Sequence, residues 1–108
     1  MKTHEEYMEL ALEEARKAEE IDEVPVGCII VCDGEVISRG HNLKEQLNQA
    51  YAHAEMMAIQ KAAEVKGNWC LNDCDLYVTL EPCMMCTGII NLSRIRTVYY
   101  GTQDPKGG

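Results

Sequence analysis

No apolar run in this 108-residue chain approaches the length of a membrane-spanning helix. The first six residues, Met1-Lys2-Thr3-His4-Glu5-Glu6, become acidic at once and lack the apolar region of a secretory signal. Internal repeats and low-complexity stretches are also missing. We therefore expect a single domain over residues 1–108, without a membrane span and located in the cytoplasm.

Basic residues are scarce, with 10 lysines and arginines against 18 aspartates and glutamates. Residues 1–23 hold nine of the acids and three of the bases, so most of the net charge of −8 falls on one N-terminal segment. Charge along a helix is usually a solvated face, which is our interpretation here. The same charge argues against a broad nucleic-acid surface on this segment, because phosphate contacts require lysine and arginine.

Six cysteines are a high count for this length, and their spacing separates them into two groups. Cys83 and Cys86 form a Cys-x-x-Cys pair, which in a cytosolic protein indicates metal binding or chemistry more often than a disulfide. The others lie in or beside apolar segments and are interpreted as core or near-surface thiols: Cys28, Cys32, Cys70 and Cys74. Cys70 and Cys74 could be half of a second metal site, but the sequence offers no evident partner pair.

Periodicity and turn residues predict the elements of the first half of the chain. Thr3 and Glu6 form a capping box, and the helical spacing of apolar residues that follows predicts a helix to about Glu20. The dipeptide Asp33-Gly34 is typical of a two-residue hairpin turn. It separates two β-branched segments that we predict to be strands, at residues 27–32 and 36–40.

In the second half of the chain, segments with helical spacing of apolar residues alternate with short apolar segments typical of strands. The polar stretch 41–51 has no clear period and is predicted to be a loop. A helix at 53–66, a strand at 75–80, a short helix at 83–91 and a strand at 97–100 follow. A strand–helix–strand unit places its two strands parallel, so we expect an α/β protein.

Polar groups typical of a metal site stand at the starts of two predicted helices. His53 and Glu55 open one, and Cys83 and Cys86 open the other, where Pro82 is expected at the first helical position. A catalytic zinc site takes three protein ligands and keeps a fourth position for water. A helix N-terminus favours thiolates, the form that binds metal. We therefore predict Zn²⁺ bound by His53, Cys83 and Cys86.

Glu55 is the residue that favours a catalytic site over a structural one. A structural zinc site needs four ligands and no free acid, whereas here a carboxylate lies two residues from the histidine. Its expected role is to take a proton from activated water and deliver it to the substrate. His-x-Glu together with Pro-Cys-x-x-Cys is the signature of zinc deaminases that act on nucleobases. His4 and His41 have no evident partners in the sequence and are expected to face solvent.

Over nearly all its length the chain resembles the bacterial tRNA-specific adenosine deaminase family. The segments that carry this resemblance are Glu23-Val24-Pro25-Val26-Gly27, Gly40-His41-Asn42, Ala52-His53-Ala54-Glu55, Leu76-Tyr77-Val78-Thr79-Leu80-Glu81-Pro82-Cys83, Ser93-Arg94-Ile95 through Tyr100-Gly101, and Asp104-Pro105-Lys106-Gly107-Gly108. The resemblance implies a cytidine deaminase-like fold, a three-layer αβα arrangement with a mixed central sheet. It also implies hydrolysis of a wobble adenosine to inosine in a tRNA anticodon loop, by a homodimer whose subunits share the RNA site.

The resemblance also implies roles for single residues. Glu55 would shuttle protons to the ring nitrogen and the leaving amine, and Asn42 would hydrogen-bond the flipped base. Val24 and Ala54 match positions in the wall of the substrate pocket, and the backbone N–H of Cys83 would face the attacking hydroxyl. The chain departs from the family at Gln49-Ala50-Tyr51, where members often have Asp-Pro-Thr, and it stops at Gly108, where members continue with further elements. We therefore expect a C-terminal truncation.

The sequence is also compatible with two other functions. The same motifs occur in deaminases that act on free bases or nucleotides such as cytosine, guanine or dCMP, and the net charge favours such small substrates. A non-catalytic binding module stabilised by zinc is an alternative of another class. The flanking segments favour tRNA over the small substrates, whereas absence of the family's C-terminal elements would favour the binding module.

Overall fold

The structure, a computed structural model, describes residues 2–102. Its elements are α1 (His4–Glu20), β1 (Gly27–Cys32), β2 (Glu35–His41), α2 (Lys44–Leu47), α3 (Ala54–Lys66), β3 (Cys74–Val78), α4 (Met84–Leu92) and β4 (Thr97–Tyr100). Residues 104–108, which carry part of the resemblance, lie outside the described residues. None of the described helices is both long and apolar enough to cross a bilayer.

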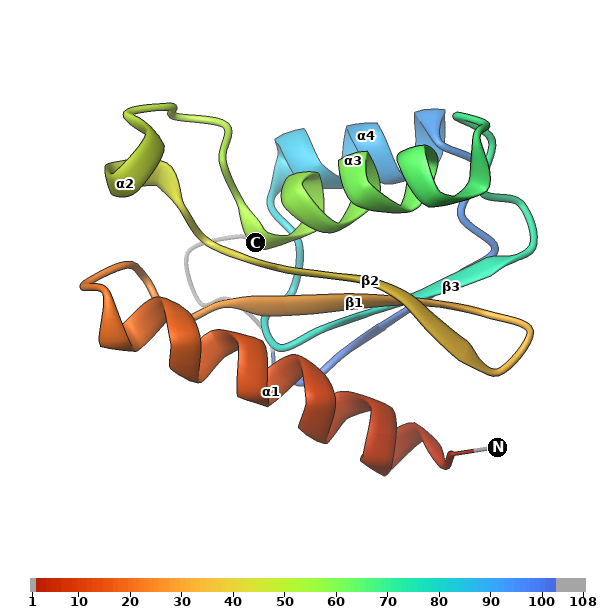
Figure 1. Ribbon diagram of the computed structural model, residues 1–108, viewed down its shortest axis with the longest axis horizontal. Coiled ribbons are helices and arrows are strands. Elements are labelled where there is room, and N and C mark those ends of the chain that lie inside the picture. The colour runs from red at the N-terminus through yellow and green to blue at the C-terminus, as the bar shows by residue number, and fades with distance from the viewer. Residues whose placement is uncertain (1, 103–108) are drawn as a thin grey trace.

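The four strands form one mixed sheet in the order β2-β1-β3-β4. Strand β1 runs antiparallel to β2 and to β3, while β3 and β4 are parallel, as expected for a strand–helix–strand unit. Helix α1 covers one face of the sheet, and α3 and α4 lie side by side on the other (Figure 1). This arrangement confirms the predicted α/β class, its three layers and its mixed central sheet.

Local signals predicted the start of α1 and the first hairpin correctly. Thr3 and Glu6 make both hydrogen bonds of the capping box. Asp33 and Gly34 have φ values of 52° and 80°, as a two-residue hairpin of the favoured type requires. The turn pairs Cys32 with Glu35 and Val31 with Val36, and a register shift between Ile30 and Val31 then brings His41 opposite Gly27.

Two glycines bring helices close to the sheet. A Cβ atom on Gly27 would lie 2.0 Å from the backbone oxygen of Ala11 in α1. A Cβ atom on Gly40 would lie 2.6 Å from the backbone oxygen of Ala54 and 2.7 Å from the backbone nitrogen of Ala58. Only glycine permits such contacts of backbone with backbone. The position of α3, whose first residue follows His53, is therefore set by its contact with β2.

The main core lies between the sheet and the pair α3 and α4. It is built mostly from small and branched side chains, including fully buried Ile30, Leu71, Leu76 and Val78. Cys28, Cys32 and Cys74 are buried and Cys70 is half-buried, and all four are free thiols. Their predicted role as core or near-surface cysteines is confirmed.

Several element boundaries differ from the prediction. Residues 44–47 form the helical turn α2 instead of loop, because the Glu23 carboxylate accepts hydrogen bonds from the backbone N–H groups of Glu45 and Gln46. Strand β3 ends at Val78, since the next rung uses the Thr79 hydroxyl oxygen to accept the Gly27 N–H. Pro82 precedes the N-cap of α4 and is not its first helical residue.

His4 is exposed, as expected, but His41 is half-buried, so the expectation that it faces solvent was wrong. Both side chains also have partners that the sequence did not indicate. His4 Nδ1 lies 2.5 Å from the Tyr77 hydroxyl, and its ring lies against Tyr99 at a centroid distance of 4.5 Å, with the ring planes tilted by 31°. His41 Nδ1 lies 3.1 Å from Glu14 Oε1. These partners stand 73 and 27 residues away along the chain, so only the packing of α1 on the sheet brings them together.

Candidate metal and catalytic site

The structure brings His53, Cys83 and Cys86 to one point. His53 Nδ1 lies 3.6 Å from Cys83 Sγ and 3.6 Å from Cys86 Sγ. The three ligand atoms all lie within 4.8 Å of one another. One nitrogen and two sulfur atoms are the donors that zinc prefers.

The geometry arises because α3 and α4 lie side by side and each begins at the same end of the sheet (Figure 1). His53 is the N-cap of α3 and Cys83 is the N-cap of α4, both with extended backbone. Neither side chain makes a hydrogen bond to cap its helix, so both are free to face the other. Cys86 lies three residues after Cys83, on the same side of the first turn of α4.

Burial shifts the protonation of the groups around this point. Burial lowers the pKa of His53, and the nearby Lys44 ammonium adds to the effect, so the neutral imidazole that binds metals is favoured. Burial also raises the pKa of the Glu55 carboxyl, which is only 4% exposed, despite hydrogen bonds from its own backbone N–H and from Cys86. The pKa of the Cys86 thiol is raised by burial and by the acids Glu55 and Cys83 beside it.

This donor set fits a zinc ion. The thiols of Cys83 and Cys86 and the carboxyl group of Glu55 lie close together away from solvent, where their ionised forms would repel one another. A divalent cation would offset that repulsion, because a coordinating thiol loses its proton to solvent and the thiolate is held by the positive charge. Three protein ligands, with a cavity beside them, match a catalytic site better than a closed structural one.

A cavity of about 310 Å³ opens beside His53 and Cys83, near the lower end of the range for small-molecule sites. Its wall consists of Asp22, Glu23, Val24, Val26, Asn42, Lys44, Glu45, His53, Glu55, Leu80, Glu81 and Cys83. Of the residues expected at the substrate, Asn42, Val24 and Cys83 line the cavity. Ala54 is fully buried and is not among the described residues of its wall.

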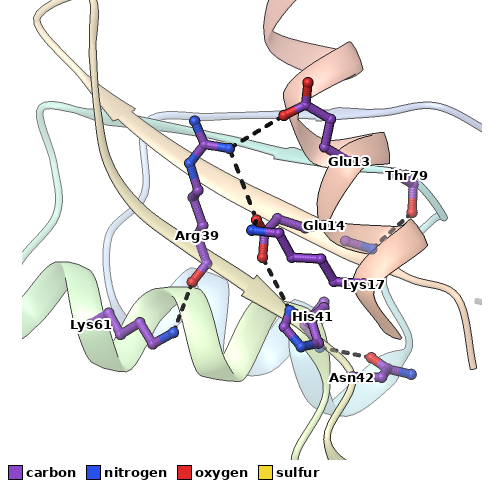
Figure 2. Close-up of polar contacts among 10 residues, drawn as sticks. Glu13, Glu14, Lys17, Arg39, His41, Asn42, Lys61 and Thr79 are labelled. Carbon is purple, nitrogen blue, oxygen red and sulfur yellow. Dashed lines mark hydrogen bonds and ion pairs between the residues drawn. The ribbon is translucent and has the colours of Figure 1, made fainter. Parts of the chain in front are cut away.

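Asn42 is oriented by its contact with α3. Its Oδ1 accepts a hydrogen bond of 2.8 Å from the backbone N–H of Ala54, the contact drawn beside Asn42 in Figure 2. Because the oxygen is used in this way, the amide nitrogen of Asn42 is the group left to donate. A donor at the cavity wall can recognise an acceptor on a ligand.

A buried carboxylate supports the strand that leads to Asn42. Glu14, from α1, contacts Lys17 Nζ at 2.6 Å, His41 Nδ1 at 3.1 Å and Arg39 at 3.9 Å (Figure 2). Burial alone would raise the pKa of Glu14, but the hydrogen bonds from Lys17 and His41 outweigh it and hold the pKa below its ordinary value. Glu14 therefore ties α1 to the end of β2 beside the site.

Sequence reasoning missed the role of Glu23. Its carboxylate is buried and holds α2 through Glu45 N–H at 3.1 Å and Gln46 N–H at 2.7 Å. This contact fixes the segment that brings Lys44 and Glu45 to the cavity wall. Because its partners lie more than twenty residues ahead, nothing local in the sequence marks Glu23 for this role.

Comparison with known proteins identifies the family. The model of the cytidine and deoxycytidylate deaminase zinc-binding region matches residues 1–102. The chain belongs to this family. A tRNA-specific adenosine deaminase of Streptococcus pyogenes serotype M18 (strain MGAS8232) is 54% identical over 102 residues, which cover 94% of this chain and 64% of that relative. The chain thus spans a little under two thirds of the relative's length.

Solved structures of the family share this fold. A structure from a study of A-to-I editing by tRNA:A34 deaminases at the wobble position is 55% identical, with a TM-score of 0.94, and the match covers 96% of this chain and 80% of that one. The guanine deaminase of Bacillus subtilis is 38% identical, with a TM-score of 0.91, over 94% of this chain and 66% of that one. The expected cytidine deaminase-like fold is confirmed.

Proposed function

We propose that this family member is a zinc-dependent deaminase that converts adenosine to inosine at the wobble position of a tRNA. The observation that carries the proposal is the convergence of His53, Cys83 and Cys86 beside buried Glu55, at the wall of a cavity. Similarity to a relative named tRNA-specific adenosine deaminase supports adenosine in tRNA as the substrate.

The proposed metal ligands are His53 Nδ1, Cys83 Sγ and Cys86 Sγ. When bound there, zinc supplies a water activated for hydrolysis near neutral pH. His53 is favoured as the neutral imidazole, so it can bind without first losing a proton. Cys86 is fully buried in the first turn of α4, which orients its sulfur atom and keeps it from solvent.

Glu55 is the proposed proton shuttle. Its carboxyl group lines the cavity in the first turn of α3, close to the proposed ligands. Because burial raises its pKa, the carboxyl accepts a proton more readily than an exposed glutamate. It can therefore take a proton from water and deliver it to the base and then to the leaving amine.

The proposed base pocket uses Asn42 and Val24. The amide N–H of Asn42 would donate to an acceptor on the base, since its oxygen is occupied by Ala54. Val24 is 58% exposed and offers an apolar surface against which a flipped base can stack. Ala54 acts through its backbone N–H, which orients Asn42. The backbone N–H of Cys83 is the proposed donor to the attacking oxygen.

We further propose that the protein is a homodimer and that it meets its tRNA in the cytoplasm. Helix α4 supports a second copy as a partner, because Met84 and Leu92 leave apolar surface exposed, 89% and 70% respectively. Sedimentation equilibrium of the protein measures its mass in solution. A mass of one chain at micromolar concentration would contradict the dimer.

The test of catalysis is Glu55→Ala, with Glu64→Ala, an exposed acid of the same helix, as the matched control. We expect Glu55→Ala to keep one zinc ion per chain and to lose about 10²- to 10⁴-fold in kcat on a tRNA anticodon stem-loop. Cys83→Ala should lose both zinc and stability. If Glu55→Ala binds zinc and works as well as the control, the protein is a zinc-stabilised binding module and not a deaminase.

A second candidate is a deaminase of free bases or nucleotides. The acids Asp22, Glu23, Glu45 and Glu81 line the cavity and repel phosphates, and the guanine deaminase structure is similar over nearly the whole chain. An assay of the stem-loop beside guanine, cytosine and dCMP separates the two. Inosine formation in the stem-loop is the expected result, and turnover of the small substrates alone would contradict the tRNA proposal.

A further inference from the structure

A second group of metal-ligating side chains lies at the end of α3 away from His53. Cys32 ends β1, Cys74 begins β3, and Asp73 directly precedes Cys74. The two sulfur atoms and a carboxylate oxygen of Asp73 lie within 4.8 Å of one another. The carboxylate contacts both thiols, with Oδ2 at 3.3 Å from Cys32 Sγ and Oδ1 at 3.4 Å from Cys74 Sγ.

Strand pairing creates this group. In the antiparallel pair of β1 and β3, Cys32 stands directly opposite Cys74, so both side chains point to the same face of the sheet. Cys74 is fully buried and Cys32 nearly so, while the side chain of Asp73 is 42% exposed. The ligand atoms therefore meet at the margin of the core, where an ion can enter from the side of Asp73.

Lys66 sets the charge of the group. It is the last residue of α3, and its Nζ lies 2.5 Å from Asp73 Oδ2 and 3.6 Å from Cys32 Sγ. With both thiols deprotonated, two thiolates and one carboxylate oppose one ammonium, which leaves two negative charges. One divalent cation neutralises them.

We propose that Cys32, Cys74 and Asp73 form a second metal site, for a thiophilic divalent cation such as Zn²⁺ or Cd²⁺. On binding, the two S–H bonds break, two metal–sulfur bonds form, and both protons pass to solvent. Asp73 adds an oxygen ligand, and Lys66 neutralises the remaining negative charge of the ligands. Two sulfur donors select against Mg²⁺ and Ca²⁺, which prefer oxygen.

This site is separate from the one at His53. Helix α3 lies between them, and its 13 residues span about 20 Å at 1.5 Å per residue. In Figure 1 the start of α3 and the turn between α3 and β3 lie at opposite ends of this helix. The two sites share no ligand, so each can be removed without the other, and the second does not depend on the proposed deaminase activity.

The test counts cations on the full chain by native mass spectrometry, after titration with Cd²⁺ under reducing conditions. We expect two Cd²⁺ per wild-type chain and two for Cys70→Ser, which changes a thiol outside both groups. Cys32→Ser and Asp73→Asn should each keep one Cd²⁺ and weaken the other by at least about tenfold. Cys83→Ser should lose the Cd²⁺ at His53 and keep the one at Cys32 and Cys74. The variants therefore show which of the two proposed sites, if either, does not bind metal.

Three results would overturn the proposal. The first is a single Cd²⁺ on the wild-type chain that Cys83→Ser removes. The second is a second Cd²⁺ that survives both Cys32→Ser and Asp73→Asn. The third is a wild-type mass lower by two hydrogens under the same reducing conditions, with Cys32 joined to Cys74 as a disulfide. Asp73→Asn keeps the result interpretable if Cys32→Ser unfolds, because the Asp73 side chain lies outside the core and is 42% exposed.

Discussion

The amide oxygen of Asn42 accepts a hydrogen bond from the backbone N–H of Ala54 at 2.8 Å. Ala54 is the first residue of α3, where helix N–H groups have no partner within the helix. The Asn42 side chain therefore accepts from an otherwise unpaired N–H group of the helix that carries Glu55, and it also lines the cavity beside that helix. The Asn42 amide therefore both helps to position α3 and is available to recognise a ligand in the cavity.

Substitutions of Asn42 should separate these two tasks. Asn42→Asp keeps an acceptor for Ala54 but replaces the donor, so we expect near-wild-type stability and a loss of about 10- to 100-fold in kcat/KM. Asn42→Ala should lose the same activity and also about 1 kcal/mol of stability. Urea unfolding and steady-state kinetics on the preferred substrate measure the two effects. Full activity of Asn42→Asp would show that the amide donor is not used.

Gly40→Ala should displace α3. The new methyl group would lie within 2.7 Å of two backbone atoms of the helix, so either the helix or β2 must move. We expect a loss of about 1–3 kcal/mol and weaker zinc binding, because His53 moves with the helix. Gly88→Ala is the control, since no atom lies within 4 Å of its Cβ and alanine favours helix. Equal stability of both variants would contradict this account of α3.

Glu23→Gln should loosen α2 without unfolding the protein. A glutamine can accept from Glu45 N–H or Gln46 N–H but presents an N–H group to the other, so one hydrogen bond is lost. We expect faster amide exchange at residues 44–49, by about fivefold for a loss of about 1 kcal/mol. Glu45→Gln changes an exposed acid in the same segment and serves as the control. Unchanged exchange in Glu23→Gln would remove the capping role.

Glu14 should contribute to stability at neutral pH and lose that contribution in acid. Its pKa in the folded protein is lower than in the unfolded chain, so folding favours the carboxylate. The contribution is complete well above the unfolded glutamate pKa of about 4.3 and disappears as pH falls through the lower folded pKa. Glu14→Gln should therefore be less stable than wild type at pH 7 and approach it in acid.

The measurement for Glu14 is urea unfolding at a series of pH values, with Glu13→Gln as the control. Glu13 lies beside Glu14 on α1, but its side chain is half exposed and makes one distant contact, at 3.7 Å from Arg39. We expect the control to follow the wild-type curve throughout. A constant difference between Glu14→Gln and wild type from neutral to acid pH would contradict the role of the carboxylate.

Features that depend on neighbouring residues were predictable from the sequence. The capping box of Thr3 and Glu6 and the Asp33-Gly34 turn both act within a few residues. The meeting of His53, Cys83 and Cys86 was also predictable, because His53 and Cys83 each open a predicted helix and Cys86 follows Cys83 by three residues. Two helix starts at the same end of one sheet were enough to expect their meeting.

Other features that join distant segments, which no motif marks, could not be predicted. The contacts of Glu23 with α2, of Glu14 with His41 and of Cys32 with Cys74 each span more than twenty residues. A single sequence contains no local sign of such partners, since each side chain alone resembles a solvated acid or a core thiol. The same cause led to the wrong expectation for His41, whose partner Glu14 lies on α1.

The contact of Gly40 with the backbone of α3 also affects how the protein tolerates change. Side chains of the core can be exchanged and repacked, but no exchange of side chains can relieve a collision between two main chains. In a library of random single substitutions, Gly40 should therefore accept as few replacements as His53, although it has no chemical role. Substitutions elsewhere in the core should therefore leave the position of α3, and with it the shape of the site, unchanged as long as Gly40 is kept.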